Sequence, residues 1–461
     1  MRFNSYTFFV FLLIYLLFWV ATRKKNTFFK AGTLFFSYLF YAWSYPPYVF
    51  LLLTSTFIDF FCGIKIDAAN AKKQKRIFLI ISLCANLGML AYFKYFNFFL
   101  DVFGDIAGIS VQNLNILLPV GISFYTFQSM SYTIDVYRGK IHRETSFLDF
   151  ALYVSFFPQL VAGPIVFARD FLKQLKNPPL YNVDNLYRGI MLILFGIFLK
   201  SVIADSLSNG VDQFFLNPEQ FTAYEAFYYC YCYAFQIFGD FAGYSYIAIG
   251  IALVIGYVFP KNFDYPYLSL SITDFWHRWH MSLSHWLKEY LYFSLGGNRR
   301  GQIITYVNLM ITMLLGGLWH GASWNFVIWG GIHGIMLSIE KFLMKVTPAL
   351  FESKNKLLLF VRWFITFHLV ILAWIFFRTS TLSSAFTVFR TLTNFSDSEF
   401  LLQARIPFVL ISLIFIAAIF REKIYKFIFS SKVAYSFTAF ILFYLWLTMG
   451  KNSNSFIYFQ F

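Results

Sequence analysis

The stretch LLLFVRWFITFHLVILAWIFF, residues 357–377, decides the fold, because Arg362 is its only formally charged side chain. A helix that crosses the hydrocarbon core of a bilayer needs about 20 consecutive apolar residues. Apolar runs of this kind recur along the whole chain, which is 59% hydrophobic and only 13% charged, whereas soluble domains carry about 25% charged residues. The sequence therefore predicts an all-α polytopic membrane protein that forms a single domain over residues 1–461.

Basic clusters mark the expected loops between the crossing helices. Loops rich in Lys and Arg stay in the cytoplasm, and their alternation with the apolar runs gives the amino terminus an outside location. Twelve apolar segments lie near residues 6–22, 28–44, 47–64, 77–99, 116–137, 185–205, 223–259, 303–318, 324–340, 357–377, 407–420 and 433–449, and from them we expect about eleven crossing helices. The segment 223–259 is too long for one straight crossing, and we expect a bent or doubled helix there.

This topology places residues 261–300 in the cytoplasm and the carboxyl-terminal tail, residues 450–461, outside the membrane. The run Tyr6–Thr22 has no small-residue cleavage site, so we expect a retained first helix. Pro158 and Pro164 interrupt another apolar stretch. Non-helical backbone at membrane depth needs surrounding protein or water, which indicates a re-entrant segment lining a cavity. A kinked ordinary helix explains the same residues.

The formal net charge of +15 would suggest a nucleic-acid partner in a soluble protein. Here the basic residues lie in short loops, so membrane topology explains them, and part of the charge is available for an anionic ligand. We expect no nucleic-acid partner. Four cysteines lie in or beside apolar segments, at Cys62, Cys84, Cys230 and Cys232, which indicates buried thiols rather than disulfides or a zinc site.

The densest polar stretch is DFWHRWHMSLSHWLKEYLYFSLGGNRRG, residues 274–301. Its periodicity predicts one amphipathic helix at the cytoplasmic surface, with His280 on the apolar face, His285 on the polar face and His277 between them. A histidine on an apolar face is commonly a packing residue, so His280 is either that or a catalytic candidate. His277 and His280 have the spacing of two metal ligands, but no acidic partner completes a site, and we expect no metal.

A basic rim accompanies this helix, formed by Arg278, Lys288, Arg299 and Arg300. Arginine suits bidentate contacts with phosphate groups, which indicates an anionic ligand on the cytoplasmic side. Anchoring of a cytoplasmic loop explains the same charges equally well.

A second candidate stretch is LLGGLWHGASWNFVIWGGIHG, residues 314–334. It places His320 inside a membrane segment, where ionisable residues are costly and are functional candidates by default. The glycines around His320 allow close backbone approach and a local helix break. A neutral imidazole can take a proton from a hydroxyl group and return it. His333 is more typical of a hydrogen-bonded packing residue.

The chain ends with NSNSFIYFQF, residues 452–461, which is uncharged and aromatic and has one tyrosine, Tyr458, in its final six residues. Aromatic side chains favour the membrane interface, so one interpretation is a hydrophobic plug at the outer surface. The other is that the phenol of Tyr458 takes part in chemistry.

Several of these stretches resemble the membrane-bound O-acyltransferase (MBOAT) family, in its bacterial branch that O-acetylates envelope polysaccharides. The matching motifs are FWHRWHMSLSHWLKEYLYFSLGGNRRG (275–301), GGLWHGASW (316–324), LPVGISFYTFQSMSYTIDVYRG (118–139), FFPQLVAGPIV (156–166), QIFGDFAGYSYIAIG (236–250) and AWIFFR (373–378). They run across most of the chain. One departure is Tyr246, where the branch often has Asp.

The resemblance implies a ring of helices around a central tunnel, with the catalytic histidine at His320 and a second signature histidine at His280. It implies acetyl-CoA as a donor that enters from the cytoplasm, without a permanently bound cofactor. It also implies that the donor is bound by the basic rim and by Trp276 and Trp319, the tryptophans near the two histidines in the sequence. It also implies a bacterial inner-membrane location.

In the related D-alanylation system, a partner protein carries a carboxyl-terminal Phe-x-Tyr motif that accepts the acyl group, and FIYFQF is similar to it. We therefore expect His320 to activate Tyr458 as a transient acyl acceptor. An extracytoplasmic SGNH-type O-acetyltransferase would then pass acetyl to a polysaccharide, peptidoglycan first and an exopolysaccharide such as alginate next. Direct O-acylation of a glycan or lipid hydroxyl, D-alanyl transfer and transport of an acylated lipid remain alternatives.

Overall fold

The computed structural model describes residues 1, 3, 5–161, 163–177, 181–395, 412 and 415–450, and every regular element in these ranges is a helix. Eight helices in this part of the chain are long and apolar enough to cross a membrane: Tyr48–Ala68, Lys72–Ala107, Val183–Leu216, Ala223–Ile255, Gln302–His320, Trp324–Val346, Lys356–Arg378 and Lys432–Met449. The predicted all-α class is confirmed. The count of about eleven crossings stays a prediction, and the segment expected at 407–420 lies largely outside the described residues.

The chain divides into two compact units, here called unit 1 and unit 2. Unit 1 consists of Met1–Ile193 and Ser245–Pro260, and unit 2 of Leu194–Tyr244 and Lys261–Phe461. The helices of unit 1 are α1 (Tyr6–Thr22), α2 (Asn26–Ala42), α3 (Tyr48–Ala68), α4 (Lys72–Leu90), α5 (Phe96–Ala107), α6 (Ile122–Tyr137), α7 (Phe147–Ser155), α8 (Phe157–Leu160), α9 (Ala168–Leu175) and the first part of α10 (Val183–Ile197), with a π-helical turn at Ala91–Tyr95.

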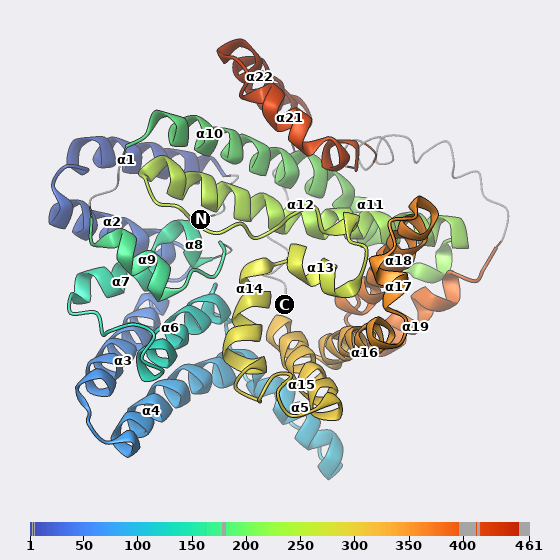
Figure 1. The fold of residues 1–461 in the computed structure, drawn as a ribbon, viewed down its shortest axis with the longest axis horizontal. Helices are drawn as coiled ribbons and strands as arrows, with labels where there is room; N and C mark the ends of the chain where they lie inside the picture. Colours follow the sequence, from blue (N-terminus) through green and yellow to red (C-terminus); the bar gives the residue numbers. More distant parts are fainter. Residues whose placement is uncertain are drawn as a thin grey trace. The chain divides into compact units, whose positions relative to one another are not determined.

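A buried polar cluster joins three helices of unit 1, α3, α4 and α6, which lie side by side (Figure 1). Asp59 on α3 accepts hydrogen bonds from Ser82 and Asn86 on α4, at 2.5 and 2.8 Å, and from Ser129 on α6. A buried carboxylate needs such partners because desolvation is costly. The cluster therefore fixes how these three helices pack.

The breakers at residues 158–164 interrupt the helix, so the interpretation as one kinked helix is wrong. Helix α7 ends at Ser155, α8 has only four residues, and residues 164–167 are not helical. Phe156 and Phe157 are fully buried, and Phe156 packs against Phe171 with 5.2 Å between ring centroids. Surrounding protein thus shelters this irregular backbone, as membrane depth requires.

Unit 2 holds every candidate site residue that the structure describes, in its helices or in the turns between them. Its helices are α11 (Asp205–Leu216), the first part of α12 (Ala223–Ile255), α13 (Ile272–Arg278), α14 (Met281–Trp286), α15 (Gln302–His320), α16 (Trp324–Val346), α17 (Pro348–Glu352), α18 (Lys356–Arg378), α19 (Leu382–Thr391), α21 (Arg421–Ile428) and α22 (Lys432–Met449), with π-helical turns at Phe198–Ala204 and Leu287–Tyr292 and 3₁₀ turns at Pro218–Gln220 and Pro266–Leu268.

Helix α12 is continuous over 33 residues, so the expected doubling is wrong, and the expected bend stays a prediction. Its glycines do not break the helix; they let neighbouring backbone approach. A Cβ atom at Gly239 would lie 2.9 Å from the carbonyl oxygen of Leu199, and one at Gly243 would lie 2.7 Å from that of Gly196. A helix of this length extends about 50 Å, which exceeds the roughly 30 Å of a hydrocarbon core.

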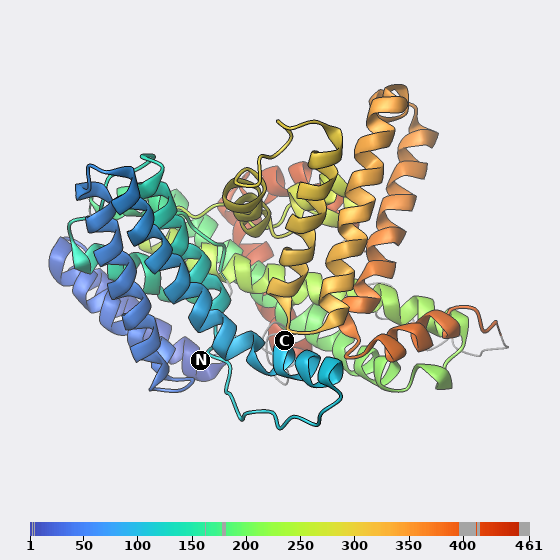
Figure 2. The same ribbon diagram turned by 90° about the horizontal axis from the view of Figure 1, so that it is seen from below.

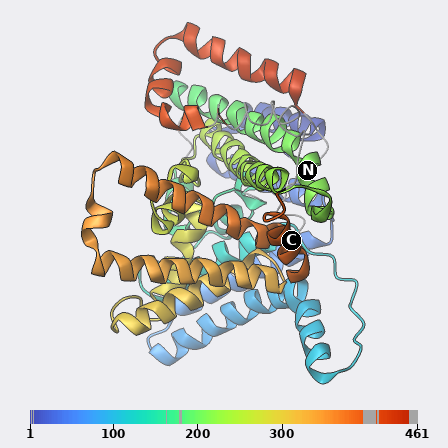
Figure 3. The same cartoon turned by 90° about the vertical axis from the view of Figure 1, so that its right-hand side faces the viewer.

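Helices α15, α16 and α18 form the part of unit 2 that positions the site. In Figure 2 they run alongside one another, and Figure 3 shows the hairpin that α16 forms with α18. Asn355 begins α18 by accepting hydrogen bonds from the backbone N–H groups of Leu357 and Leu358, which are among the donors that a helix start leaves unsatisfied.

Candidate active site

His320 is the last residue of α15, and three aromatic rings enclose it. The distances between its ring centroid and those of Trp319, Trp329 and Phe377 are 5.0, 5.1 and 5.2 Å. Its exposed fraction is only 3%. The expected helix break is confirmed, because α15 ends here and Gly321 is extended. We call the three enclosing residues the aromatic box.

Close contact between α15 and α16 fixes the spacing of this box. A Cβ atom at Gly317 would lie 2.2 Å from the carbonyl oxygen of Phe326, and one at Gly330 would lie 2.2 Å from that of Met313. Only glycine fits at such a distance. The Asn325 amide donates to the carbonyl oxygen of Thr379 at 2.8 Å, and thereby joins the start of α16 to the end of α18.

His280 lies at a break between two short helices, so the expected single amphipathic helix over 274–301 is wrong. Helix α13 ends at Arg278 and α14 begins at Met281. His280 adopts a left-handed backbone conformation with φ 42° and ψ 53°, which residues other than glycine rarely adopt. Such conformations persist only where tertiary contacts hold them, and they gather at functional sites.

The His280 side chain is fully buried in a mainly aromatic pocket. Its ring centroid is 4.6 Å from that of Phe241 and 6.0 Å from that of Trp319. Its Nδ1 atom lies 3.2 Å from Oδ1 of Asn262. Burial lowers the pKa of His280 to about 3, so its imidazole is neutral at physiological pH.

The structure brings the two signature histidines together around one indole, because Trp319 contacts both His280 and His320. A third buried histidine, His333, is hydrogen-bonded, as its interpretation as a packing residue requires. It accepts a hydrogen bond at Nδ1 from Trp276 Nε1 at 3.3 Å, and its ring centroid is 4.8 Å from that of Trp329.

An open cavity of about 650 Å³ lies beside this cluster, and we call it the basic cavity. It shares Trp276 with the cluster. It is lined by Thr273, Trp276, His277, Ser284, Leu287, Lys288, Tyr292, Phe293, Asn298, Arg299, Leu309, Thr312, Met313, Leu337, Lys341 and Met344. Three of the residues predicted to bind the donor, Trp276, Lys288 and Arg299, therefore line one cavity. Lys341 adds a third positive charge.

The other three residues predicted to bind the donor do not line the cavity. Arg278 forms an ion pair with Asp274 at 2.7 Å. Arg300 lies over Gly296, with its Cδ and Nε atoms 3.3 Å from where a Cβ atom there would stand. Trp319 is buried between the two histidines instead.

Two buried contacts hold the walls of the basic cavity. The Asn308 amide on α15 donates to the carbonyl oxygen of Gly297 at 2.8 Å, which fixes the loop that carries Arg299. The Glu340 carboxylate on α16 accepts hydrogen bonds from the backbone N–H groups of Ile272 and Thr273, at 2.6 and 3.2 Å. It thereby caps α13, which carries Trp276 and His277.

Sequence reasoning missed Asn262, Lys341 and Glu340. Lys341 belongs to a cluster that membrane topology already explained. Asn262 and Glu340 act through partners far away in the sequence, which local periodicity does not detect. Tyr458 lies outside the described residues.

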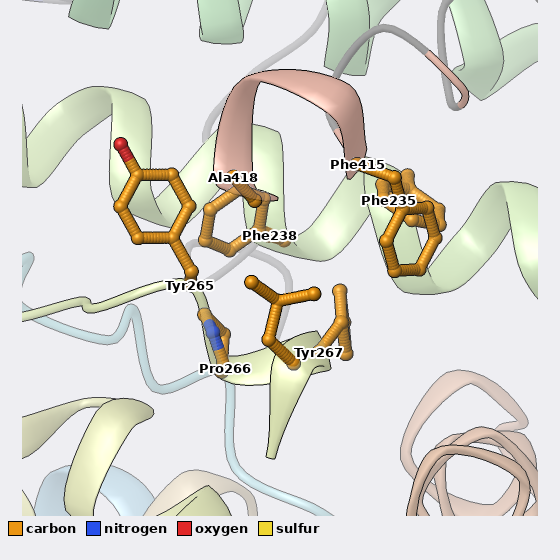
Figure 4. A pocket seen from close by; sticks show the side chains of 8 residues that line it. Phe235, Phe238, Tyr265, Pro266, Tyr267, Phe415 and Ala418 are labelled. Atoms are coloured by element: carbon orange, nitrogen blue, oxygen red, sulfur yellow. The ribbon is translucent and has the colours of Figure 1, made fainter. Parts of the chain in front are cut away.

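A second hollow, of only about 20 Å³, lies between α12 and the turn at Pro266–Leu268 (Figure 4). The eight residues that line it are apolar except for Tyr265 and Tyr267, and the Tyr267 hydroxyl donates to the carbonyl oxygen of Ala234 at 2.6 Å. The described residues that line it include no carboxylate, imidazole or cationic group, so it is not the candidate active site.

Comparison with known proteins identifies the family. The sequence profile of the membrane-bound O-acyltransferase family matches residues 35–382, which include both signature histidines and the whole lining of the basic cavity. A probable alginate O-acetylase from Azotobacter vinelandii is 41% identical over 366 residues, covering 78% of this chain and 72% of the relative. A peptidoglycan O-acetyltransferase from Helicobacter pylori is 39% identical over 396 residues, covering 80% and 75%.

A teichoic acid D-alanyltransferase from Bacillus subtilis is 29% identical over 274 residues, covering 56% of this chain and 67% of the relative. The profile match and these relatives agree with the apolar helices and with the two histidine motifs. The chain is a multi-pass membrane acyltransferase that belongs to the membrane-bound O-acyltransferase family.

Proposed function

We propose that this acyltransferase takes acetyl groups from acetyl-CoA in the bacterial cytoplasm and moves them across the inner membrane for O-acetylation of a cell-envelope polysaccharide. Relatives named for O-acetylation of alginate and peptidoglycan support the class of reaction. The observation that carries the proposal is the basic cavity, which shares Trp276 with the buried cluster around His320.

The composition of the basic cavity supports a CoA thioester as the donor. Lys288, Arg299 and Lys341 supply three positive charges, which suit the phosphate groups of CoA. Leu309 and Met313 give part of the wall an apolar surface for the pantetheine arm. A volume of about 650 Å³ lies within the range of about 300–1,000 Å³ typical of ligand pockets.

In the proposed chemistry His320 acts as general base and Tyr458 as transient acceptor. His320 takes the phenol proton, the phenolate oxygen attacks the thioester carbonyl carbon, the carbon–sulfur bond breaks, and the thiolate takes the proton from the imidazolium. The products are an acetyl ester on Tyr458 and free CoA. A phenol has a pKa near ~10, far below that of an aliphatic alcohol, so an imidazole deprotonates it more easily.

Reach and partners are consistent with a relay. The tail from residue 450 to residue 461 spans at most about 40 Å when extended, whereas half a hydrocarbon core is about 15 Å thick. An extracytoplasmic SGNH-type O-acetyltransferase would collect the acetyl group and pass it to peptidoglycan, or next to an exopolysaccharide such as alginate. The D-alanyltransferase relative keeps D-alanyl transfer as a second candidate.

The relay is tested by intact mass spectrometry of the carboxyl-terminal peptide after the purified protein is incubated with acetyl-CoA. We expect one added acetyl group in the wild type and none in His320→Ala or Tyr458→Phe. Tyr458→Phe keeps the ring and removes only the hydroxyl, so it is the matched control for packing of the tail.

Two other outcomes are informative. Release of CoA with added glycan, while the tail stays unmodified in all three proteins, would mean direct transfer to a glycan hydroxyl. Modification only by a D-alanyl thioester would replace acetyl with D-alanyl as the transferred group.

A further inference from the structure

The side chain of Asn262 accepts three hydrogen bonds at one oxygen. Its Oδ1 atom lies 3.2 Å from the backbone nitrogen of Ser282, 2.9 Å from the Ser282 hydroxyl and 3.2 Å from Nδ1 of His280. A backbone N–H group can only donate. The atom that faces it must therefore be the amide oxygen of Asn262, which settles the orientation of the amide group.

This orientation determines the tautomer of His280. An amide oxygen only accepts hydrogen bonds, so Nδ1 of His280 must carry the proton that it shares with Asn262. In a neutral imidazole the other nitrogen, Nε2, then carries the lone pair. A neutral His280 in this tautomer accepts a hydrogen bond at Nε2 and does not donate one there.

Backbone hydrogen bonds from Asn262 and from Asp264, two positions later, also hold the segment around His280. The Asn262 carbonyl oxygen accepts a hydrogen bond from Met281 N–H at 2.9 Å, and Asp264 N–H donates to the Arg278 carbonyl oxygen at 2.9 Å. These two contacts flank His280 and fix its left-handed backbone. Asn262 thus controls both the conformation and the protonation pattern of this histidine.

Within the part of the chain that the structure describes, three charged side chains on elements next to His280 form ion pairs. These side chains have opposite charges as partners within 2.8 Å: Asp240 on α12 with Lys200, Lys261 with Asp264 in the preceding segment, and Arg278 with Asp274 on α13. Desolvation lowers the pKa of His280, which favours the neutral imidazole.

We infer that Asn262 is a positioning residue, which holds His280 as a hydrogen-bond acceptor for an N–H or O–H group of a substrate. The inference rests on the proposed acyl transfer, and it assigns His280 a role distinct from that of the base. A neutral His280 of this kind does not stabilise an oxyanion. It orients either the amide groups of the donor arm or the hydroxyl group of the acceptor.

The direct test is ¹⁵N NMR of histidine-labelled full-length protein in lipid nanodiscs, since ring-nitrogen shifts distinguish the two neutral tautomers and the imidazolium. The chain has seven histidines, and the signal lost in His280→Asn assigns His280. We expect the Nδ1–H tautomer from pH 8 down to pH 5.5. The Nε2–H tautomer, or an imidazolium in the wild type at pH 7, would overturn the inference. This test does not depend on acyl transfer.

The functional test compares Asn262→Asp with wild type by initial rates of free-thiol release from acetyl-CoA between pH 5.5 and 9. Aspartate keeps the accepting oxygen but stabilises the imidazolium, so the variant-to-wild-type rate ratio should fall about tenfold per pH unit on the acid side. A ratio that is lowered but constant with pH would show a purely structural role. Absence of thiol release in the wild type would count against the proposed function, and NMR alone would then decide on Asn262.

Substitutions of His280 itself distinguish the loss of a hydrogen-bond acceptor at Nε2 from a disturbance of the left-handed backbone. Asparagine tolerates a left-handed backbone but reaches only the Nδ1 position, whereas the amide oxygen of glutamine reaches the Nε2 position. We expect His280→Asn to lose at least 100-fold in rate and His280→Gln to lose about tenfold less. Equal losses in both variants would contradict the acceptor role. A rise confined to KM for acetyl-CoA would identify the donor arm as the partner, and a fall confined to kcat would identify the acceptor hydroxyl.

Discussion

Arg299 and Arg300 are neighbours in the chain with different surroundings. Arg299 lines the basic cavity, whereas Arg300 lies over Gly296. Adjacent residues of one type in one exposed loop thus form a natural pair for testing whether the cavity binds the phosphate groups of the donor. The two substitutions change the net charge of the protein by the same amount, so a difference between them reports position rather than overall charge.

We predict that Arg299→Met raises KM for acetyl-CoA about tenfold and leaves kcat within about twofold, because a hydrogen bond to a charged group contributes about 1.5 kcal/mol. Arg300→Met should change KM by less than about twofold at the same ionic strength. Steady-state rates of thiol release measure both. Equal increases in KM for the two variants would show that Arg299 and Arg300 both contact the donor, and that lining the cavity does not distinguish Arg299.

At the scale of single residues, the sequence predicted the local structure around His320 but not that around His280. His320 and its break in the helix follow from an ionisable residue between glycines in an apolar run, and both are in the structure. The conformation of His280 did not follow, since periodicity over 274–301 favours a continuous helix. The break depends on Asn262, which lies 18 positions earlier in the sequence, and a local pattern contains no information about such a contact.

At the scale of the element, the contact between α15 and α16 determines where the aromatic box stands. Gly317 and Gly330 let two backbones meet, and Trp329 on α16 then packs against His320 at the end of α15. Not every glycine in these helices has this role. A Cβ atom at Gly331 would meet only Leu314 Cδ2, at 3.4 Å, which is an ordinary contact with a flexible side chain.

We therefore predict opposite effects for two glycine-to-alanine changes in one helix pair. Gly317→Ala should destabilise the protein by about 1–3 kcal/mol or more, because the new methyl group meets backbone atoms that cannot yield, and thiol release should fall with it. Gly331→Ala should be neutral or stabilising by up to about 1 kcal/mol, as alanine favours a helix over glycine. Thermal unfolding in detergent measures both. If Gly317→Ala were as stable and active as wild type, the close contact would not be needed.

Helix positions were predicted well where an apolar run ends at polar residues. The expected segments 303–318, 357–377 and 433–449 correspond to Gln302–His320, Lys356–Arg378 and Lys432–Met449. The interpretation of 223–259 assumed that a single helix cannot be longer than the membrane is thick. That limit holds only for a helix that stands upright in lipid, whereas 83% of the apolar window of α12 is buried inside protein. There a helix is free to be longer than the membrane is thick.

At the scale of the whole molecule, the proposed relay requires Tyr458 and the basic cavity to be reached from opposite sides of the membrane. We predict that alkaline phosphatase, which is active only outside the cytoplasm, is active when fused after Phe461 and inactive when fused after Lys354. A green fluorescent protein fused at the same two positions should give the reverse pattern, which controls for expression. Inactive phosphatase with a fluorescent fusion at Phe461 would place Tyr458 in the cytoplasm and remove the basis of the relay.

The indole of Trp319 stands between the imidazoles of His280 and His320, with ring centroids 6.0 and 5.0 Å away. An imidazolium beside an indole is attracted to the ring and quenches its fluorescence. Each time His320 accepts the proton of an incoming hydroxyl group, the emission of Trp319 should dip and then recover as the thiol leaves. A single turnover would thus be visible as a transient decrease in tryptophan fluorescence that Trp319→Phe abolishes. Trp319 would then report the rate of the chemical step without an added label.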